Sequence, residues 1–334
     1  MLSLVGVGGA GCKVVESFYR KDLISSLLSK IYSKEEGYAT GVAIDTSDSL
    51  RALNMPAANR ILIGSSRAKG HGTGGDVELG IKIMNEELEL AMSVVRRANQ
   101  EKPEAFFIVA GLGGGTGTGG FAVLADKIKK TYEVPVVGIL IFPPRGEGVL
   151  YMKNAYENFD SVVKSIDGAI VLDSNVLTSR GESISKSYKI IDEAIFNVLS
   201  IVEPRDLTRI TKGRVSTIGF MRIKPERISI KDILDKVFRN YVYFNADKIE
   251  NMYFVAYGAI QNIYGQSFAK KWAEEKFGMD VEYIFKDDPS SKYLNIGLIL
   301  SGLSNVEKVL KVEHQEEKVS SELDELLGDI KPLF

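Results

Sequence analysis

A run of glycine and threonine at residues 111–120, GLGGGTGTGG, is the segment best suited to hold an anion. It follows the apolar residues 105–110, which predict a buried strand, and precedes the periodic residues 121–132, which predict a helix. Because glycine has no side chain, a phosphate can approach the backbone N–H groups closely, and the helix N-terminus favours negative charge. Thr116 and Thr118 add hydroxyl donors. The alternative is a flexible surface loop, although such loops seldom join an apolar strand to a helix.

A second glycine-rich segment lies at Gly6–Gly11, after another predicted strand, and is followed by Cys12 and Lys13. Its GxGxxG spacing occurs in dinucleotide-binding folds, which also need an acid about 20 residues further on. The first acid that ends the second predicted strand is Asp45, which lies too far along the chain. Two glycine-rich loops on one sheet can enclose a triphosphate from both sides, whereas NAD needs only one such loop. The presence of two therefore counts against a site for NAD. The alternative is an NAD-dependent oxidoreductase that uses Gly6–Gly11.

A third glycine-rich segment, KGHGTGGD at residues 69–76, precedes a predicted helix. Its Gly72, Thr73 and Gly74 are placed to approach a terminal phosphate. The alternative is a plain turn into the helix, which Asp76 would cap.

Side chains that suit a nucleoside follow later in the chain. Glu147 comes after the predicted strand 134–142, where a carboxylate can accept two ribose hydroxyls; the alternative is a charge at a helix N-terminus. Tyr188 and Asp192 are four residues apart on a predicted helix and therefore face the same side. An aromatic ring can stack on guanine and a carboxylate can bind its N–H edge. The alternative for Tyr188 is simple packing.

Glu203 and Asp206 follow the predicted helix 182–202. Acids in this position are usually solvated, but beside a γ-phosphate they can polarise an attacking water. The helix is about 30 Å long, so they cannot reach a nucleotide held near its beginning in the same molecule. Only a neighbouring copy in a head-to-tail stack can bring them there, and contacts of this kind build filaments.

The elements that must position these residues alternate between strands and helices over the first 200 residues. This alternation predicts an α/β fold, a Rossmann-like doubly wound parallel sheet whose ligands lie at the carboxyl ends of the strands. The predicted strands are 2–6, 39–45, 60–64, 105–110, 134–142 and 168–173. The predicted helices are 11–30, 75–100, 118–132, 148–165 and 182–202.

The chain divides into four parts by sequence pattern. Residues 1–181 form the predicted nucleotide-binding domain, and 182–202 form a central connecting helix. Residues 203–304 predict a smaller C-terminal α+β domain with a mixed or antiparallel sheet of its own. The charged tail at 305–334 is either a partly disordered solvated segment or a segment that binds a protein partner.

Composition excludes several classes of function. With 45% hydrophobic and 26% charged residues among 334, the chain has the composition of a globular protein of two domains. A net charge of −2 gives no reason to expect nucleic acid or an anionic membrane as a partner. No apolar run approaches the 20 or so residues of a membrane span, and we expect no leader segment. The single cysteine and two histidines predict no metal site and a reducing compartment, the cytoplasm.

The sequence GGGTGTG at residues 113–119 matches the signature loop of tubulin. In motif content and order, the chain resembles the tubulin/FtsZ superfamily over residues 1–300. Segments 11–13 and 61–72 are most similar to the archaeal CetZ group.

This resemblance implies a cytoskeletal GTPase that binds GTP or GDP, with Mg²⁺ held by phosphate oxygens and water. It also implies head-to-tail protofilaments in which the next subunit completes hydrolysis, through Glu203 and Asp206. CetZ relatives serve cell shape and FtsZ relatives cell division; the CetZ role is the expectation here, with division as the alternative. The residues that the resemblance and the motifs assign to GTP are Gly8, Gly9, Ala10, Gly11, Cys12, Lys13, Asp45, Gly72, Thr73, Gly74, Gly113, Gly114, Gly115, Thr116, Gly117, Thr118, Glu147, Ser174, Asn175, Tyr188 and Asp192.

Overall fold

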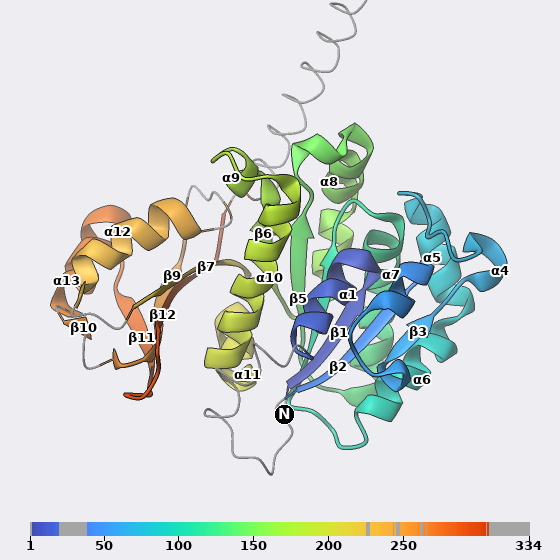
Figure 1. Cartoon of the computed structure of the whole chain (residues 1–334), viewed down its shortest axis with the longest axis horizontal. Coiled ribbons are helices and arrows are strands. Elements are labelled where there is room, and N and C mark those ends of the chain that lie inside the picture. The colour runs from blue at the N-terminus through green and yellow to red at the C-terminus, as the bar shows by residue number, and fades with distance from the viewer. Residues whose placement is uncertain are drawn as a thin grey trace, which may run out of the picture.

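The computed structural model describes residues 2–19, 39–224, 228–242, 244, 248–260, 263–264, 266–304 and 306. A ten-stranded sheet runs through the molecule and helices cover its faces (Figure 1). In spatial order its strands are β11 (Val281–Asp287), β9 (Asn251–Gly258), β12 (Leu294–Ser301), β7 (Val215–Ile223), β6 (Gly168–Asp173), β5 (Val136–Phe142), β4 (Ala105–Gly111), β1 (Leu2–Val7), β2 (Ala39–Asp45) and β3 (Arg60–Leu62). Two short strands, β8 (Ile228–Ser229) and β10 (Ile263–Tyr264), form a separate pair.

The seven strands from β1 to β7 are parallel to one another, which confirms the predicted doubly wound α/β fold. From β1 the chain passes first to β2 and β3 on one side, and then to β4, β5 and β6 on the other. The order therefore reverses between β1 and β4. In sheets of this kind, ligands bind beside the carboxyl ends of the strands at such a point.

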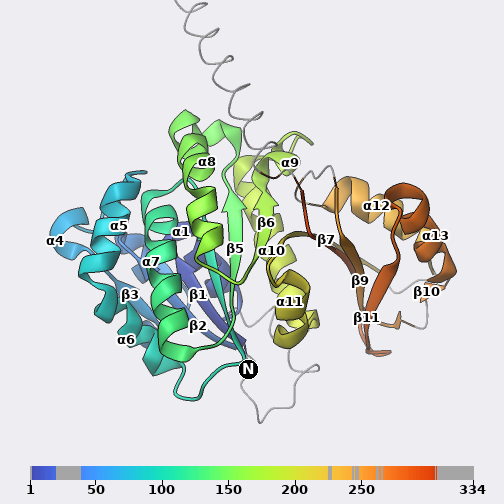
Figure 2. The same ribbon diagram turned by 180° about the vertical axis from the view of Figure 1, so that it is seen from behind.

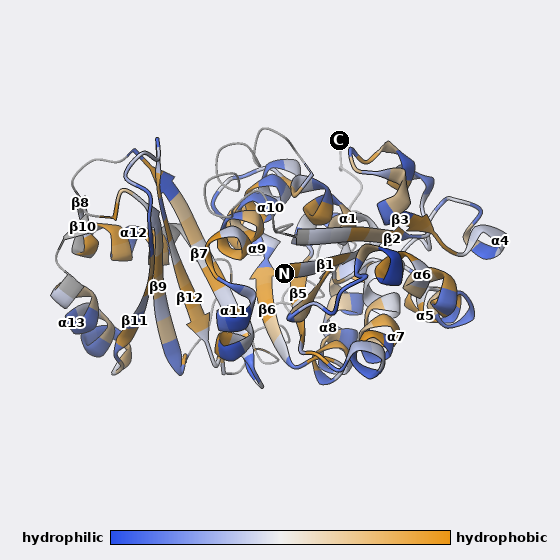
Figure 3. Cartoon of the chain, turned by 90° about the horizontal axis from the view of Figure 1, so that it is seen from below, coloured by the Kyte–Doolittle hydropathy of each residue, from blue (hydrophilic) through white to orange (hydrophobic). Residues whose placement is uncertain are grey.

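The helices lie on both faces of the sheet. Viewed from below, α1 and α10 lie on one face and α5 to α8 on the other (Figure 3). Strand β1 is buried on both faces: Leu2 and Leu4 belong to the core under α1 and α10, and Val5 and Val7 to the core under α5 to α8. The helices are α1 (Gly8–Ser17), α4 (Ser65–Ala68), α5 (Val77–Glu86), α6 (Leu88–Ala98), α7 (Gly115–Tyr132), α8 (Val149–Lys164), α9 (Ser174–Thr178), α10 (Ile184–Ile201), α11 (Pro204–Thr211), α12 (Ile230–Tyr241) and α13 (Gln266–Phe277). Short 3-10 turns occur at Asp48–Ala52, Ala57–Asn59 and Arg145–Glu147.

The sheet continues from the first half of the chain into the second. Strand β7 pairs with β6 through Ala169 opposite Val215 and Ile170 opposite Ser216. On its other edge β7 pairs with the antiparallel β12. The sequence predicts a smaller α+β domain after the central helix, and its strands β7, β12, β9 and β11 continue the sheet of the first half instead of forming a separate one (Figure 2).

Three predicted helices differ from those observed. The helix expected over 75–100 is interrupted at Glu87, whose carboxylate accepts a hydrogen bond of 2.9 Å from the backbone N–H of Gly64. The helix expected from residue 118 begins at Gly115, so six of the ten residues of the glycine run are helical. The helix predicted over 11–30 begins at Gly8 and ends at Ser17, so both of its predicted ends were wrong. Residues 20–30 lie outside the described residues, as does the predicted tail apart from Val306.

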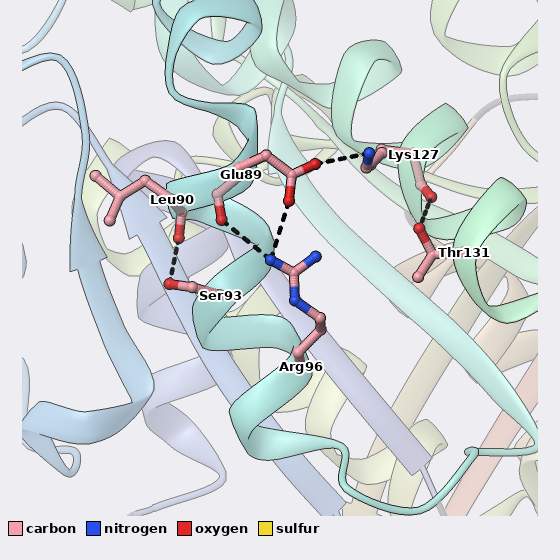
Figure 4. Close-up of polar contacts among 6 residues, drawn as sticks. All are labelled: Glu89, Leu90, Ser93, Arg96, Lys127 and Thr131. Carbon is pink, nitrogen blue, oxygen red and sulfur yellow. Dashed lines mark hydrogen bonds and ion pairs between the residues drawn. The ribbon is translucent and has the colours of Figure 1, made fainter.

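Helix α6 is joined to α7 by a small ionic cluster on the surface (Figure 4). The Glu89 carboxylate lies 3.1 Å from the Arg96 guanidinium and 2.7 Å from the Lys127 ammonium of α7. Exposed ion pairs of this kind contribute at most about 1 kcal/mol each. The position of α7 therefore depends mainly on the buried apolar side chains beneath it, among them Phe121, Leu124 and Ile128.

Among the helices that the structure describes, none combines the length and the apolar character needed to cross a membrane.

Candidate functional site

A pocket of about 440 Å³ lies at the carboxyl ends of β1 and β4, where the strand order reverses. The segments that follow β1, β2 and β4 and the loop before α5 form one part of its lining, which we call the floor. The turn Arg145–Glu147, α8 and α10 form the other part, which we call the mouth. The pocket brings together most of the residues predicted to bind GTP. These are Gly8, Gly9, Ala10, Lys13, Asp45, Gly72, Thr73, Gly74, Gly114, Gly115, Thr116, Gly117, Glu147, Tyr188 and Asp192.

Two helices begin side by side at the floor of the pocket. Helix α1 begins at Gly8 and α7 at Gly115, and a Cβ on Gly8 would lie 2.8 Å from the backbone nitrogen of Gly117. A Cβ on Gly117 would likewise lie 2.7 Å from the carbonyl oxygen of Gly111. The glycines thus let the two helix N-termini approach each other. Their unpaired N–H groups and dipoles make this floor favourable for a polyphosphate.

Buried hydroxyls connect three of the segments around the floor. The Thr116 hydroxyl lies 2.6 Å from that of Thr46, after β2, and 3.4 Å from that of Thr73, before α5. Thr118 lies outside the pocket lining, and its hydroxyl accepts a hydrogen bond of 2.7 Å from the Gly113 N–H. Thr116 is therefore placed at the pocket wall, whereas Thr118 shapes the loop before α7.

The carboxyl group of Asp45 is buried at the end of β2, only 4% exposed. Burial raises its pKa to about 6, although hydrogen bonds from the backbone N–H groups of Thr46 and Ser47 oppose the shift. At neutral pH the Asp45 carboxylate of the ligand-free protein is therefore charged, although its buried surroundings favour the neutral form. A site intended for an anion alone would not need this carboxylate, whereas one that also receives a cation would benefit from it.

We expect Asp45→Asn to stabilise the ligand-free protein above pH 6. A carboxyl with a raised folded-state pKa makes unfolding easier as the pH rises from about 4 to about 6, and above this range the cost is about 3 kcal/mol. Urea unfolding followed by the single tryptophan should show a larger gain for the variant at pH 8 than at pH 5. Asp48→Asn, which removes an exposed carboxylate, is the control. An equal gain in the free energy of unfolding at both pH values would contradict the raised pKa of Asp45.

The mouth of the pocket carries the polar groups that suit a nucleoside. The Tyr188 hydroxyl donates a hydrogen bond of 2.8 Å to Oε1 of Glu147. Burial, reinforced by the Glu147 carboxylate, raises the pKa of Tyr188 well above its ordinary range, so the hydroxyl stays a donor. Asp192 also lines the pocket, and its charge acts on Tyr188 as well. An aromatic ring and two carboxylates thus lie close together in the pocket lining.

Several predicted site residues lie behind the pocket wall. Gly11 packs on the carbonyl of Val109, where any Cβ would collide. Burial raises the pKa of the Cys12 thiol, which lies 3.5 Å from the carbonyl oxygen of Ile44. Gly113 also lies outside the lining.

Ser174 and Asn175, which the family resemblance assigns to GTP, also lie outside the pocket lining. The Asn175 side chain accepts a hydrogen bond of 2.6 Å from the Arg145 N–H and donates one of 3.3 Å to the carbonyl oxygen of Pro143. It therefore holds the turn that carries Glu147. The Ser174 hydroxyl is buried without a hydrogen-bond partner among the described residues.

The two acids predicted to be catalytic lie at the far end of α10 from the pocket. Glu203 directly precedes α11, and Asp206 lies in the first turn of that helix with 43% of its side chain exposed. Tyr188 and Asp192 line the pocket from the opposite end of α10, about 20 Å away at 1.5 Å per residue. Within one chain the acids and the pocket do not meet.

Some pocket residues were not predicted. Gly75 and His71 belong to the third glycine-rich segment, which was a usable signal. Ser47 and Ser49 closely follow Asp45, at the end of a predicted strand where ligands are expected. For Tyr151 the sequence gives no signal, because nothing in the pattern of α8 marks the side that faces the pocket. The unpredicted lining residues are Val7, Ser47, Ser49, His71, Gly75, Gly111, Leu112, Ile141 and Tyr151.

Comparison with known proteins agrees with this geometry. Residues 2–180 match the tubulin/FtsZ family, GTPase domain. The tubulin-like protein CetZ1 of Haloferax volcanii is 35% identical over 240 residues, which cover 66% of this chain and 58% of that protein. Its CetZ3 is 32% identical over 68% of this chain and 61% of its own length. The chain thus aligns with about three fifths of the length of these relatives.

Solved structures extend the likeness to nearly the whole chain. The GDP-bound monomer of H. volcanii CetZ1 superposes with a TM-score of 0.80 and 30% identity over 96% of this chain and 99% of that one. The GTPγS-bound protofilament of H. volcanii CetZ2 gives 0.76 and 26% over the same shares. These comparisons confirm the predicted resemblance to the CetZ group. With more than half of its length matched, the chain belongs to the tubulin/FtsZ family.

Proposed function

We propose that this protein binds GTP in the pocket between β1 and β4 and hydrolyses it in a head-to-tail assembly of its own copies. The floor formed by two helix N-termini suits the phosphates, and the carboxylates and tyrosine at the mouth suit a guanine nucleoside. The GDP-bound CetZ1 monomer and the GTPγS-bound CetZ2 protofilament, which share this fold, support both parts of the proposal.

The proposal gives each part of the pocket a role. Backbone N–H groups of segments 8–10, 72–74 and 114–117, which line the pocket, hold the phosphates, Glu147 the ribose, and Tyr188 and Asp192 the base. Ser174 and Asn175 support the base side from behind the wall.

Mg²⁺ fits the pocket as a companion of the nucleotide. The described residues contain no group of three histidine, cysteine or acidic side chains that would form a metal site of the protein. The ion would therefore be held by phosphate oxygens and water, where it would neutralise phosphate charge. A cation bound there would favour the charged form of the buried Asp45 carboxyl group.

The observation that carries the proposal is the separation of the acids from the pocket along α10. Glu203 and Asp206 reach a γ-phosphate only when the end of one subunit that carries α11 meets the pocket of another subunit. In that position they would orient a water molecule and accept its proton as it attacks the phosphorus. Hydrolysis then depends on assembly, because each active site needs two subunits.

The cellular role that we propose is a cytoplasmic filament in cell-shape control, as expected of a CetZ-like protein; cell division is the alternative. The charged tail at 305–334 is the proposed site for a protein partner.

Recovery of bound nucleotide tests the substrate. We expect denatured, freshly purified protein to release guanine nucleotide at up to one mole per mole of chain, identified by chromatography. Asp192→Ala should retain much less, because it removes the acceptor for the guanine N–H edge, while Asp160→Ala, which alters an exposed acid of α8, should retain as much as the unaltered protein. Recovery of NAD without guanine nucleotide would instead support the oxidoreductase alternative.

A further inference from the structure

The side chain of Asn154 joins two of the loops that form the pocket floor. Asn154 lies in α8, is only 8% exposed, and is not itself part of the pocket lining. Its amide nitrogen donates hydrogen bonds of 2.7 Å to the carbonyl oxygen of Gly75 and 2.8 Å to that of Gly113. Both N–H groups of one amide are thus used on two loops that are far apart in the sequence.

The two carbonyls belong to residues that cannot fix their own orientation. Gly75 and Gly113 have φ values of +83° and +116°, conformations that glycine adopts without preference over others. Gly113 is also followed by Gly114, so no Cβ on either side resists rotation of the peptide group between them. Contacts from outside the loop must therefore hold this peptide in one orientation.

Such contacts are present along the whole loop before α7. The Leu112 N–H donates to the carbonyl oxygen of Ile141 at 2.8 Å, and the Gly113 N–H donates to the Thr118 hydroxyl at 2.7 Å. The side-chain amide of Asn154 then donates a hydrogen bond to the carbonyl oxygen of Gly113. In a trans peptide the C=O and N–H groups point in opposite directions, so the Gly114 N–H is turned away from Asn154. Gly114 lines the pocket.

We propose that Asn154 is a positioning residue for phosphate binding: it holds the Gly113–Gly114 peptide so that its N–H, rather than its C=O, faces the phosphates. Without the amide, the peptide rotates freely and presents a carbonyl oxygen to an anion for part of the time. This inference rests on the proposed function, because it concerns the same nucleotide pocket.

The test compares GTP with guanosine, which lacks phosphates, by calorimetry on the full-length protein. We expect Asn154→Ala to weaken GTP binding roughly 10- to 100-fold, the effect of losing one hydrogen bond to a charged group. Guanosine binding should be unchanged. The control is Asn158→Ala, which removes an amide one turn further along α8 that donates to the Asn154 carbonyl and to neither loop.

Thr118→Val provides a second variant of nearly unchanged shape, and we expect it to weaken GTP selectively as well, because it releases the Gly113 N–H. The inference is overturned if Asn154→Ala keeps the GTP-to-guanosine affinity ratio of the unaltered protein. It is also overturned if both variants lose guanosine together with GTP, since the contacts would then serve the fold alone. Failure of the unaltered protein to bind GTP would instead refute the proposed function.

Discussion

Asp206→Ala is expected to lower GTP turnover by roughly 100- to 10,000-fold, the usual contribution of a general base, and to leave GTP affinity unchanged. The two effects separate because Asp206 lies beyond the end of α10, far from the pocket of its own chain. The fold should be unaffected, since the side chain is exposed and its contact with Arg209, at 3.7 Å, is an ion pair worth less than about 1 kcal/mol.

Steady-state phosphate release, together with GTP binding at a concentration too low for assembly, checks this prediction. Asp160→Ala, a change of an exposed acid on α8, is the matched control and should keep full turnover. If Asp206→Ala instead weakened GTP binding by the same factor as turnover, Asp206 would belong to the pocket of its own chain.

Gly117→Ala is expected to damage both the fold and the site. A Cβ at this position would lie 2.7 Å from the carbonyl oxygen of Gly111 and 3.3 Å from that of Val7. These are backbone atoms of the strands β4 and β1, so α7 must move away from the sheet. We expect a loss of about 1–3 kcal/mol in the free energy of unfolding. We also expect a fall of about 100-fold in GTP turnover, because the two helix N-termini separate.

Gly114→Ala is the matched control for this prediction. The same methyl group placed at Gly114 meets no atom within 4 Å, and its φ of −71° is allowed for any residue. Urea unfolding should give Gly114→Ala the stability of the unaltered protein, with any change confined to nucleotide binding. Equal stability of the two variants would show that the packing of α7 against β4 and β1 does not need Gly117.

Much of the fold was predictable because parallel strands and their helices leave strong local patterns. The apolar run at 105–110 and the glycine run after it led to β4, the pocket and α7, although α7 begins three residues earlier than predicted. The pairing of β7 with β6 was not predictable, because it involves only two residue pairs and depends on how α10 crosses the sheet. The break at Glu87 depends on a contact with Gly64, which no periodicity reveals.

The site was predictable where chemistry is carried by local sequence and not where it depends on contacts between distant segments. Glycine-rich loops after strands can be found by reading along the chain, but their role in helix packing appears only when Gly117 meets Gly111 in space. Asn154 reaches the loops from a helix whose sequence gives no sign of them. The roles assigned to Glu203 and Asp206 stay predictions, because they require a second subunit.

The central claim, that one active site is built from two subunits, is tested most directly by mixing two inactive variants. One is Asp206→Ala, with an intact pocket; the other is Glu147→Ala combined with Asp192→Ala, with a disabled pocket and intact acids. In an equimolar head-to-tail mixture, about a quarter of the interfaces join an intact pocket to an intact acid pair. We therefore predict that mixing restores up to about a quarter of the unaltered turnover per subunit. Turnover that stays at the sum of the two separate variants, in mixtures that still assemble, would contradict the account.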